Sequence, residues 1–131
     1  MKINNPKSLN TETLAYMGDA VYEQFVREML LVEGGVKVNL LHRKATHYVK
    51  ASAQAKAIKT LFDSLYESEQ ALVKRARNHK FNSKAKNADA ITYKWATAFE
   101  ALVGYLYLAE ENDRLQWVID NAFEIIERRE A

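Results

Sequence analysis

Two apolar runs decide how this chain folds: Leu14-Ala-Tyr-Met-Gly-Asp-Ala-Val21 and Ala98-Phe-Glu-Ala-Leu-Val-Gly-Tyr105. Each run is typical of buried helix. Each also contains one carboxylate, Asp19 or Glu100, with no Lys or Arg within four positions along the chain. A buried carboxylate without a counter-charge is costly, so it shifts its pKa, acquires a partner or binds a metal ion. The two acids therefore predict a cation site shared by two buried helices.

Small residues lie beside each acid or one helical turn from it. They are Ala15, Gly18 and Ala20 around Asp19, and Ala96, Thr97 and Gly104 around Glu100. Small side chains allow another helix, a metal ion or a phosphate group to come close. The alternative is that they only permit tight helix crossing, while each acid bonds to a buried Arg or hydroxyl group.

The composition favours one all-helical domain. The chain has 131 residues, of which 48% are hydrophobic, with a single Pro and four Gly. That length and composition allow a substantial core without disulfides. There is no Cys, and the three His have no paired spacing, which argues against a zinc site. The polar N-terminus and the absence of an apolar run of about 18 residues predict a soluble cytoplasmic protein.

The sequence predicts helices over residues 11–32, 38–65, 67–78, 89–110 and 113–129, with a break near 50–52 and a loop over 79–88. Asn10 or Ser8 would cap the first helix, and Gly34-Gly35 would end it. Helices 11–32 and 89–110 carry apolar side chains nearly all round, which predicts central positions. The last helix has a single apolar stripe from Leu115 to Ile126.

Positive charge is concentrated in two windows. Residues 34–62 hold six Lys or Arg and no acid, and residues 74–94 hold seven against one Asp. The net charge of the whole chain is only +2, so the remaining residues are acidic overall. Such segregation is expected of a polyanion-binding surface, although solvated helix faces would also explain it.

The two acidic motifs resemble those of a known enzyme family. The pattern Glu12-x-Leu14-x-Tyr16-x-Gly18-Asp19-Ala20-Val21 is similar to the signature of the ribonuclease III catalytic domain. The run Thr97-Ala-Phe-Glu-Ala-Leu-Val-Gly104 is similar to that family's second acidic motif. The short length and residues 74–78, 86–89 and 93–100 resemble the Mini-III ribonucleases within the family. The resemblance covers most of the chain.

The resemblance implies an all-α, ribonuclease III-like endonuclease domain over residues 1–131, without a separate double-stranded RNA-binding domain. It implies a compact bundle of about six to seven helices whose two central helices carry the acidic site. The implied activity is Mg²⁺-dependent hydrolysis of double-stranded RNA by a homodimer, leaving 5′-phosphate and 3′-hydroxyl ends. The implied substrate is the precursor of 23S ribosomal RNA, and a ribosomal protein that presents it is a further candidate partner. Asp19 and Glu100 match the family's metal-binding catalytic residues.

Two positions depart from the full-length family. Ala15 and Thr97 stand where relatives place a Glu and an Asp. Fewer anionic ligands predict weaker cation binding with more water, and leave open whether one or two ions act. Glu12 matches an earlier Glu of the signature, but its place near the helix start also suits the helix dipole. Glu23 is either an outer residue that orients a ligand or the ion-pair partner of Arg27, and the sequence slightly favours the ion pair.

Several basic and polar residues in or beside the predicted loop are expected to contact RNA phosphates. They are Arg75, Arg77, Asn78, His79, Lys80, Lys84 and Lys86. His42 and His47 are expected to be surface or interface residues rather than ligands, and Tyr16 and Met17 are candidates for a dimer interface. Two competing functions also fit the sequence. One is a catalytically silent RNA-binding module of the same fold, and the other is a structural helical protein with internal salt bridges.

Overall fold

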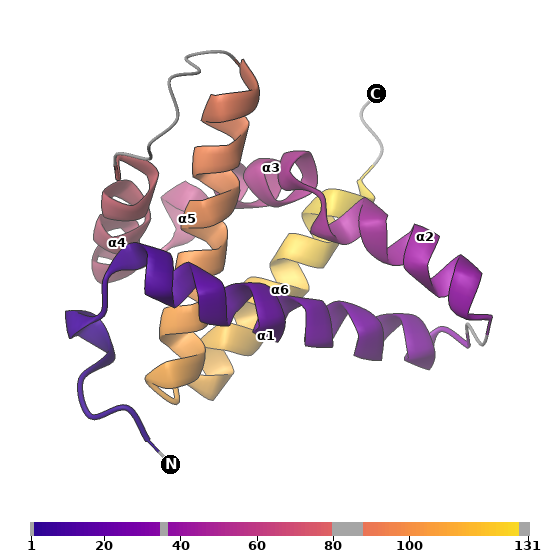
Figure 1. The fold of residues 1–131 in the computed structure, drawn as a ribbon, viewed down its shortest axis with the longest axis horizontal. Helices are drawn as coiled ribbons and strands as arrows, with labels where there is room; N and C mark the ends of the chain where they lie inside the picture. The colour runs from indigo at the N-terminus through magenta and orange to yellow at the C-terminus, as the bar shows by residue number, and fades with distance from the viewer. Residues whose placement is uncertain (1, 35–36, 80–87, 129–131) are drawn as a thin grey trace.

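The computed structural model describes residues 2–34, 37–79 and 88–128, and within them it confirms an all-α fold. The α-helices of these residues are α1 (Thr11–Val32), α2 (Val38–Val49), α3 (Ala51–Leu61), α4 (Glu67–Arg77), α5 (Ala88–Leu108) and α6 (Asn112–Glu127). Short 3-10 turns cover Pro6–Ser8 and Phe62–Ser64. Figure 1 shows α5 running through the molecule, with α1 lying across it. In the described part of the chain, no helix is long and apolar enough to cross a membrane.

Local chemistry explains the helix boundaries. The Asn10 side chain accepts a hydrogen bond from the Thr13 amide at 2.8 Å, so Asn10 rather than Ser8 caps α1. The chain leaves α1 through Gly34, whose φ of 95° suits a residue without a Cβ. A single extended residue, Lys50, separates α2 from α3 at the predicted break. Of the predicted loop, residues 80–87 lie outside the described residues.

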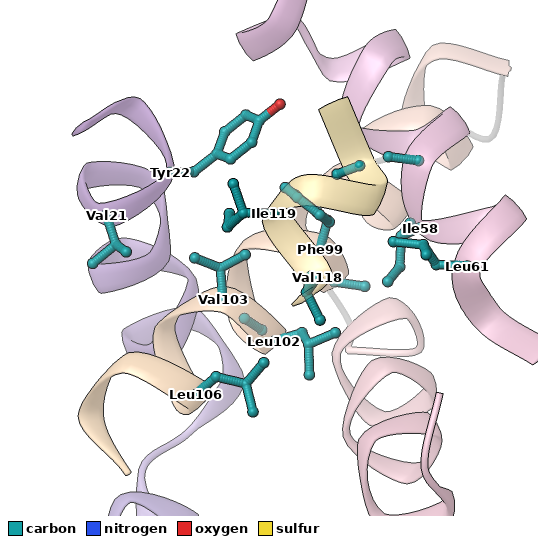
Figure 2. Packing of buried hydrophobic residues seen from close by; sticks show 14 of the residues in the cluster. Val21, Tyr22, Ile58, Leu61, Phe99, Leu102, Val103, Leu106, Val118 and Ile119 are labelled. Atoms are coloured by element: carbon teal, nitrogen blue, oxygen red, sulfur yellow. The ribbon is translucent and has the colours of Figure 1, made fainter. Parts of the chain in front are cut away.

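The core is built around α5, as predicted. Phe99, Leu102, Val103 and Leu106 are fully buried and meet side chains from the helices packed around α5. Figure 2 shows these residues facing Val21 and Tyr22 of α1, Ile58 and Leu61 of α3, and Val118 and Ile119 of α6. The apolar stripe of α6 is buried along most of its length, which confirms the periodicity.

The predicted central position of α1 holds for one face, because Leu14, Tyr22 and Val26 are buried against the core while the opposite face is open to solvent. Tyr16 is 82% exposed, and Leu31 and Val32 at the end of the helix are exposed as well. The reason is that α1 crosses α5 with one face only, while its C-terminal half extends past the bundle beside α2 (Figure 1). Met17 packs partly against the core. The homodimer implied by the resemblance stays a prediction, for which Tyr16 offers exposed apolar surface.

Two glycines allow α1 and α5 to touch through their backbones. A Cβ added to Gly18 would collide with the carbonyl group of Glu100, and one added to Gly104 would collide with the carbonyl group of Leu14. Each added Cβ would also lie 2.9 Å from the backbone nitrogen of the other glycine. The obstacles are backbone atoms, which cannot rotate away. The crossing therefore requires glycine on both helices.

The position of α4 is set by a buried ion pair with α6. The Arg114 guanidinium donates two parallel hydrogen bonds of 2.8 Å to the carboxylate of Glu69, which is only 4% exposed. The same guanidinium lies between the rings of Tyr66 and Trp117, at 3.8 and 4.0 Å from their centroids. Glu69 also accepts a hydrogen bond from the Tyr66 amide at the start of α4. This arrangement fixes the helix whose last turn carries Arg75 and Arg77.

We predict that Gly18→Ala destabilises the fold by about 3 kcal/mol, because the added methyl group must push two backbones apart. The reverse change at an exposed site of the same helix, Ala20→Gly, is the control. It should cost only about 1 kcal/mol, the difference in helix propensity, and that propensity alone would make Gly18→Ala stabilising. Urea unfolding measures both. A Gly18→Ala protein as stable as wild type would contradict the backbone contact.

Candidate active site

The α1–α5 crossing brings the two predicted acids to one cavity. Gly18 meets the Glu100 backbone, so its neighbour Asp19 lies beside the Glu100 side chain. The cavity has a volume of about 420 Å³ and is open to solvent. Its lining residues are Glu12, Ala15, Tyr16 and Asp19 from α1, and Tyr93, Thr97 and Glu100 from α5. The predicted pairing of Asp19 with Glu100 across two helices is therefore what the fold produces.

The predicted burial of the acids is only partly correct. Glu100 is half-buried, but Asp19 is exposed along the cavity wall. Sequence periodicity marked both runs as apolar, but it could not show that the small residues between them leave the cavity open to water. The pair is a desolvated carboxylate facing a solvated one, rather than two buried charges.

Burial and Asp19 together raise the pKa of Glu100 to about 8 from an ordinary value of 4.5. Desolvation is the largest cause, followed by a hydrogen bond with Asp19 and the repulsion of its charge. The Gln54 side chain opposes them through a hydrogen bond that lowers the pKa of Glu100. In the absence of a cation, Glu100 is thus largely protonated at neutral pH.

The two positions that depart from the family pattern, Ala15 and Thr97, add no charge to the cavity and leave space in it. Ala15 and Thr97 are buried and line the cavity next to the acids. The Thr97 hydroxyl donates to the Tyr93 carbonyl group at 2.9 Å, within its own helix. In the described residues no three His, Cys, Asp or Glu side chains gather closely enough to form a metal cluster. Asp19 and Glu100 are the carboxylates that line this cavity at the crossing, and Glu12 adds a third at its rim.

A third helix reaches the acidic pair through Gln54 of α3, which the sequence did not single out. Gln54 is buried, and its Nε2 donates to the Val49 carbonyl group at 2.8 Å. Its Oε1 is buried and has no hydrogen-bond partner in the described part of the chain. An uncharged polar residue inside an ordinary helix gives no sequence signal, and the contact with Glu100 spans 46 positions of the chain.

The remaining predicted acids have different partners. Glu12 lies on the cavity rim, and its carboxylate is 2.7 Å from Nε2 of His79, just beyond the end of α4. This bond connects the first turn of α1 to the start of the predicted loop. Glu23 accepts a 2.7 Å hydrogen bond from Arg27 and lines a separate cavity between α1 and α2, so the predicted ion pair is confirmed.

The predicted RNA-contacting residues fall into two groups. Arg75 and Asn78 are exposed near the end of α4, while Lys80, Lys84 and Lys86 lie outside the described residues. The Arg77 guanidinium lies 4.9 Å from the ring centroid of Trp95, and Lys59 of α3 lies 5.7 Å from the same centroid. This aromatic meeting point of α3, α4 and α5 was not predicted. His42 and His47 are exposed, as predicted.

The donor set fits a hard divalent cation such as Mg²⁺. A partly desolvated carboxyl group held beside a second one is stabilised in its charged form by a positive charge placed between them. The cavity next to them is wide enough for water, which Mg²⁺ usually retains in proteins.

Comparison with known proteins agrees with the fold and the motifs. The family model described as Ribonuclease III domain matches residues 12–111. The chain is 52% identical to "Mini-ribonuclease 3" of Symbiobacterium thermophilum over 98% of each chain, and 49% identical to that of Brevibacillus brevis over 94% of this chain and 92% of the relative. It superposes on a crystal structure of a Fusobacterium nucleatum protein with a TM-score of 0.79 and 27% identity, over 95% of this chain and 98% of that one. The chain therefore belongs to the ribonuclease III family of endoribonucleases, within the Mini-ribonuclease 3 group.

Proposed function

We propose that this chain is a Mg²⁺-dependent endonuclease that cleaves double-stranded RNA at the Asp19–Glu100 cavity. One observation carries the proposal: the α1–α5 crossing holds a desolvated and a solvated carboxylate together at an open cavity. Holding two carboxylates so close costs stability, which a structural role would not require. The names of the Mini-ribonuclease 3 relatives support a ribonuclease activity.

In this proposal Asp19 and Glu100 hold the cation. When bound, the ion supplies Lewis-acid stabilisation of charge on a phosphate and lowers the pKa of water at the site. The small Ala15 and the internally bonded Thr97 leave room in the cavity for water and for a phosphodiester. None of the described cavity residues is a His, so we assign no protein general base.

The proposed substrate is duplex RNA, and its maturation target is the 23S ribosomal RNA precursor named by the family resemblance. Exposed cations at the end of α4 suit the phosphate backbone of an A-form duplex, which proteins recognise mainly by shape. The His79–Glu12 bond keeps this end of α4 close to the rim of the acidic cavity. Phosphate contacts and the cleavage site would then lie on one surface.

The second candidate is an RNA-binding module of the same fold that does not cleave. The absence of carboxylates at Ala15 and Thr97 favours it, because both positions line the cavity without adding charge. Against it stands the raised pKa of Glu100, since a binding module gains nothing from a strained acidic pair.

We predict that Asp19→Asn and Glu100→Gln each lower the cleavage rate of a long RNA duplex by more than about 100-fold, because each removes one of two anionic ligands. Cleavage is measured on a gel with and without Mg²⁺. Glu23→Gln is the matched control, since this acid lies on the same helix but pairs with Arg27. Wild-type protein that binds the duplex but does not cut it at any Mg²⁺ concentration would establish the silent module instead.

The raised pKa of Glu100 predicts how the stability of the metal-free protein depends on pH. Folding favours the protonated form of this acid, so its contribution to stability is complete below about pH 4.5. That contribution is lost as the pH rises toward about 8. Over this pH range, the melting temperature of wild type should therefore fall relative to that of Glu100→Gln. Added Mg²⁺ should restore part of the lost melting temperature of wild type. If the melting temperatures of the two proteins changed with pH in parallel, the result would contradict the desolvation of Glu100.

The basic surface is tested through the salt dependence of binding. Arg75→Ala should weaken duplex binding and reduce the slope of log K against log salt by about 1, because it removes one phosphate contact. Arg128→Ala is the control, because Arg128 is an exposed cation of the C-terminal end that pairs with Glu124. Fluorescence anisotropy with a labelled duplex in Ca²⁺ gives the slope of log K against log salt for wild type and for each of the two variants. Equal slopes for all three proteins would exclude the end of α4 from the RNA-binding surface.

A further inference from the structure

The first basic window of the sequence, residues 34–62, takes no part in the acidic cavity. It holds six Lys or Arg and no acid. Among the described residues, those that line the acidic cavity all come from α1 and α5, outside this window. Most of the window forms α2 and α3, so its positive charge belongs to another surface of the molecule.

A groove lies between α3 and the first half of α5. It has a volume of about 330 Å³ and is open to solvent. Its lining residues, which define what we call the α3 groove, are Ser52, Ala55, Lys56, Lys59 and Thr60 of α3 and Thr92 of α5. A second groove of about 200 Å³ shares Ser52 and Lys56 with it and adds His47 and Lys50 at the junction of α2 and α3. Among the described residues, neither groove is lined by an acid.

The ring of Trp95 connects the α3 groove to the end of α4. The ammonium nitrogen of Lys59 lies 5.7 Å from the ring centroid, and the guanidinium group of Arg77 lies 4.9 Å from it. Trp95 is half-buried and packs against the core, which fixes the ring that both cations contact. Two positive charges held at one ring repel each other, and an anion bound beside them offsets that repulsion.

The lining of the α3 groove fits a phosphate backbone. Lysine ammonium groups and the hydroxyl groups of Ser and Thr are among the side-chain groups that contact phosphate and sugar oxygens in nucleic acids. A lipid surface would require large apolar side chains next to the cations. Among the described lining residues, the only apolar side chain is that of Ala55. The chemistry of the groove therefore favours a nucleic acid over a membrane.

The α3 groove and the acidic cavity face different sides of α5. Thr92 lines the groove, and the next residue, Tyr93, lines the cavity. Consecutive residues of an α-helix point about 100° apart, so one phosphate group cannot occupy both places. An RNA that fills both must continue past the segment that lies at the acidic cavity.

We propose that the α3 groove binds the phosphate backbone of RNA that flanks the duplex held at the acidic cavity. The inference rests on the proposed function, since it extends the surface that binds the same substrate. The protein would then bind a duplex within a longer RNA more tightly than a short duplex alone, because only the longer RNA reaches both places.

The test uses the double variant Lys56→Gln/Lys59→Gln, which removes two charges from the α3 groove. The control is Lys2→Gln/Lys7→Gln, which removes two charges from the N-terminal segment, where Lys2 pairs with Glu110. Binding is measured by fluorescence anisotropy in Ca²⁺ on a short duplex and on the same duplex with single-stranded extensions at both ends. On the extended RNA, we expect the groove variant to bind at least about tenfold more weakly at low salt. Its slope of log K against log salt should fall by about 2, while the control matches wild type. The loss should be smaller on the short duplex.

Each other outcome counts against a stated part of the inference. Wild-type affinity of the groove variant for the extended RNA would overturn it, and an equal loss on both RNAs would refute the flanking position. Loss of poly-glutamate binding with unchanged RNA binding would assign the groove to an acidic protein instead. If the first variant does not fold, Lys50→Gln/Lys59→Gln replaces it, because this pair leaves the half-buried Lys56 in place.

The inference and the proposed nuclease activity fail separately. Binding in Ca²⁺ is measured without cleavage, so the groove is tested whether or not the protein cuts RNA. If the groove variant lost affinity but wild type cut no duplex in Mg²⁺, the nuclease activity would be refuted and the groove supported. If wild type cut the duplex but the groove variant bound the extended RNA equally well, only the groove would be refuted.

Discussion

The contact between the backbones of α1 and α5 at Gly18 and Gly104 is the constraint on which both the core and the site depend. It lets α5 lie deep enough for Phe99 and Leu102 to be covered on all sides. It also determines where the acids lie, because Asp19 follows one glycine directly and Glu100 precedes the other by one turn. The two helices must touch without side chains between them at these glycines. This one geometric requirement joins two acids that are 81 positions apart in the chain.

The crossing places two acids close together, which destabilises the folded state, and packing elsewhere in the fold must offset this. Glu100 is partly desolvated and faces Asp19, and its pKa rises because the charged form is disfavoured. The surrounding packing is dense and apolar, and the Arg114–Glu69 ion pair fastens α4 to α6 on another side of the bundle. Proteins commonly accept local instability of this kind at sites where function needs it. The acidic cavity follows that pattern, since neither acid contributes to the hydrophobic core.

The sequence was sufficient for the helices because caps and breaks are local. Asn10 and Lys50 act through their own backbone neighbours, and the resulting boundaries agree with prediction to within a residue or two. Burial was harder to predict, because an apolar stretch does not reveal which of its faces another helix covers. This explains why Asp19 is exposed against expectation. The Gln54–Glu100 and Glu12–His79 contacts were beyond reach, since each joins residues that only the tertiary fold brings together.

The scarcity of carboxylates at the cavity has a thermodynamic consequence. If Asp19 and Glu100 are the anionic ligands that this chain supplies, the remaining positions around a cation fall to water, to neutral oxygens or to the substrate phosphate. A phosphate that binds the cation raises the affinity of the site for it, and the same coupling must raise the affinity for RNA by an equal factor. The cations at the end of α4, held near the cavity rim through His79 and Glu12, would add to that coupling because they favour the same bound phosphate backbone. A site with few acids can therefore bind its cation weakly when alone and firmly once the duplex is in place.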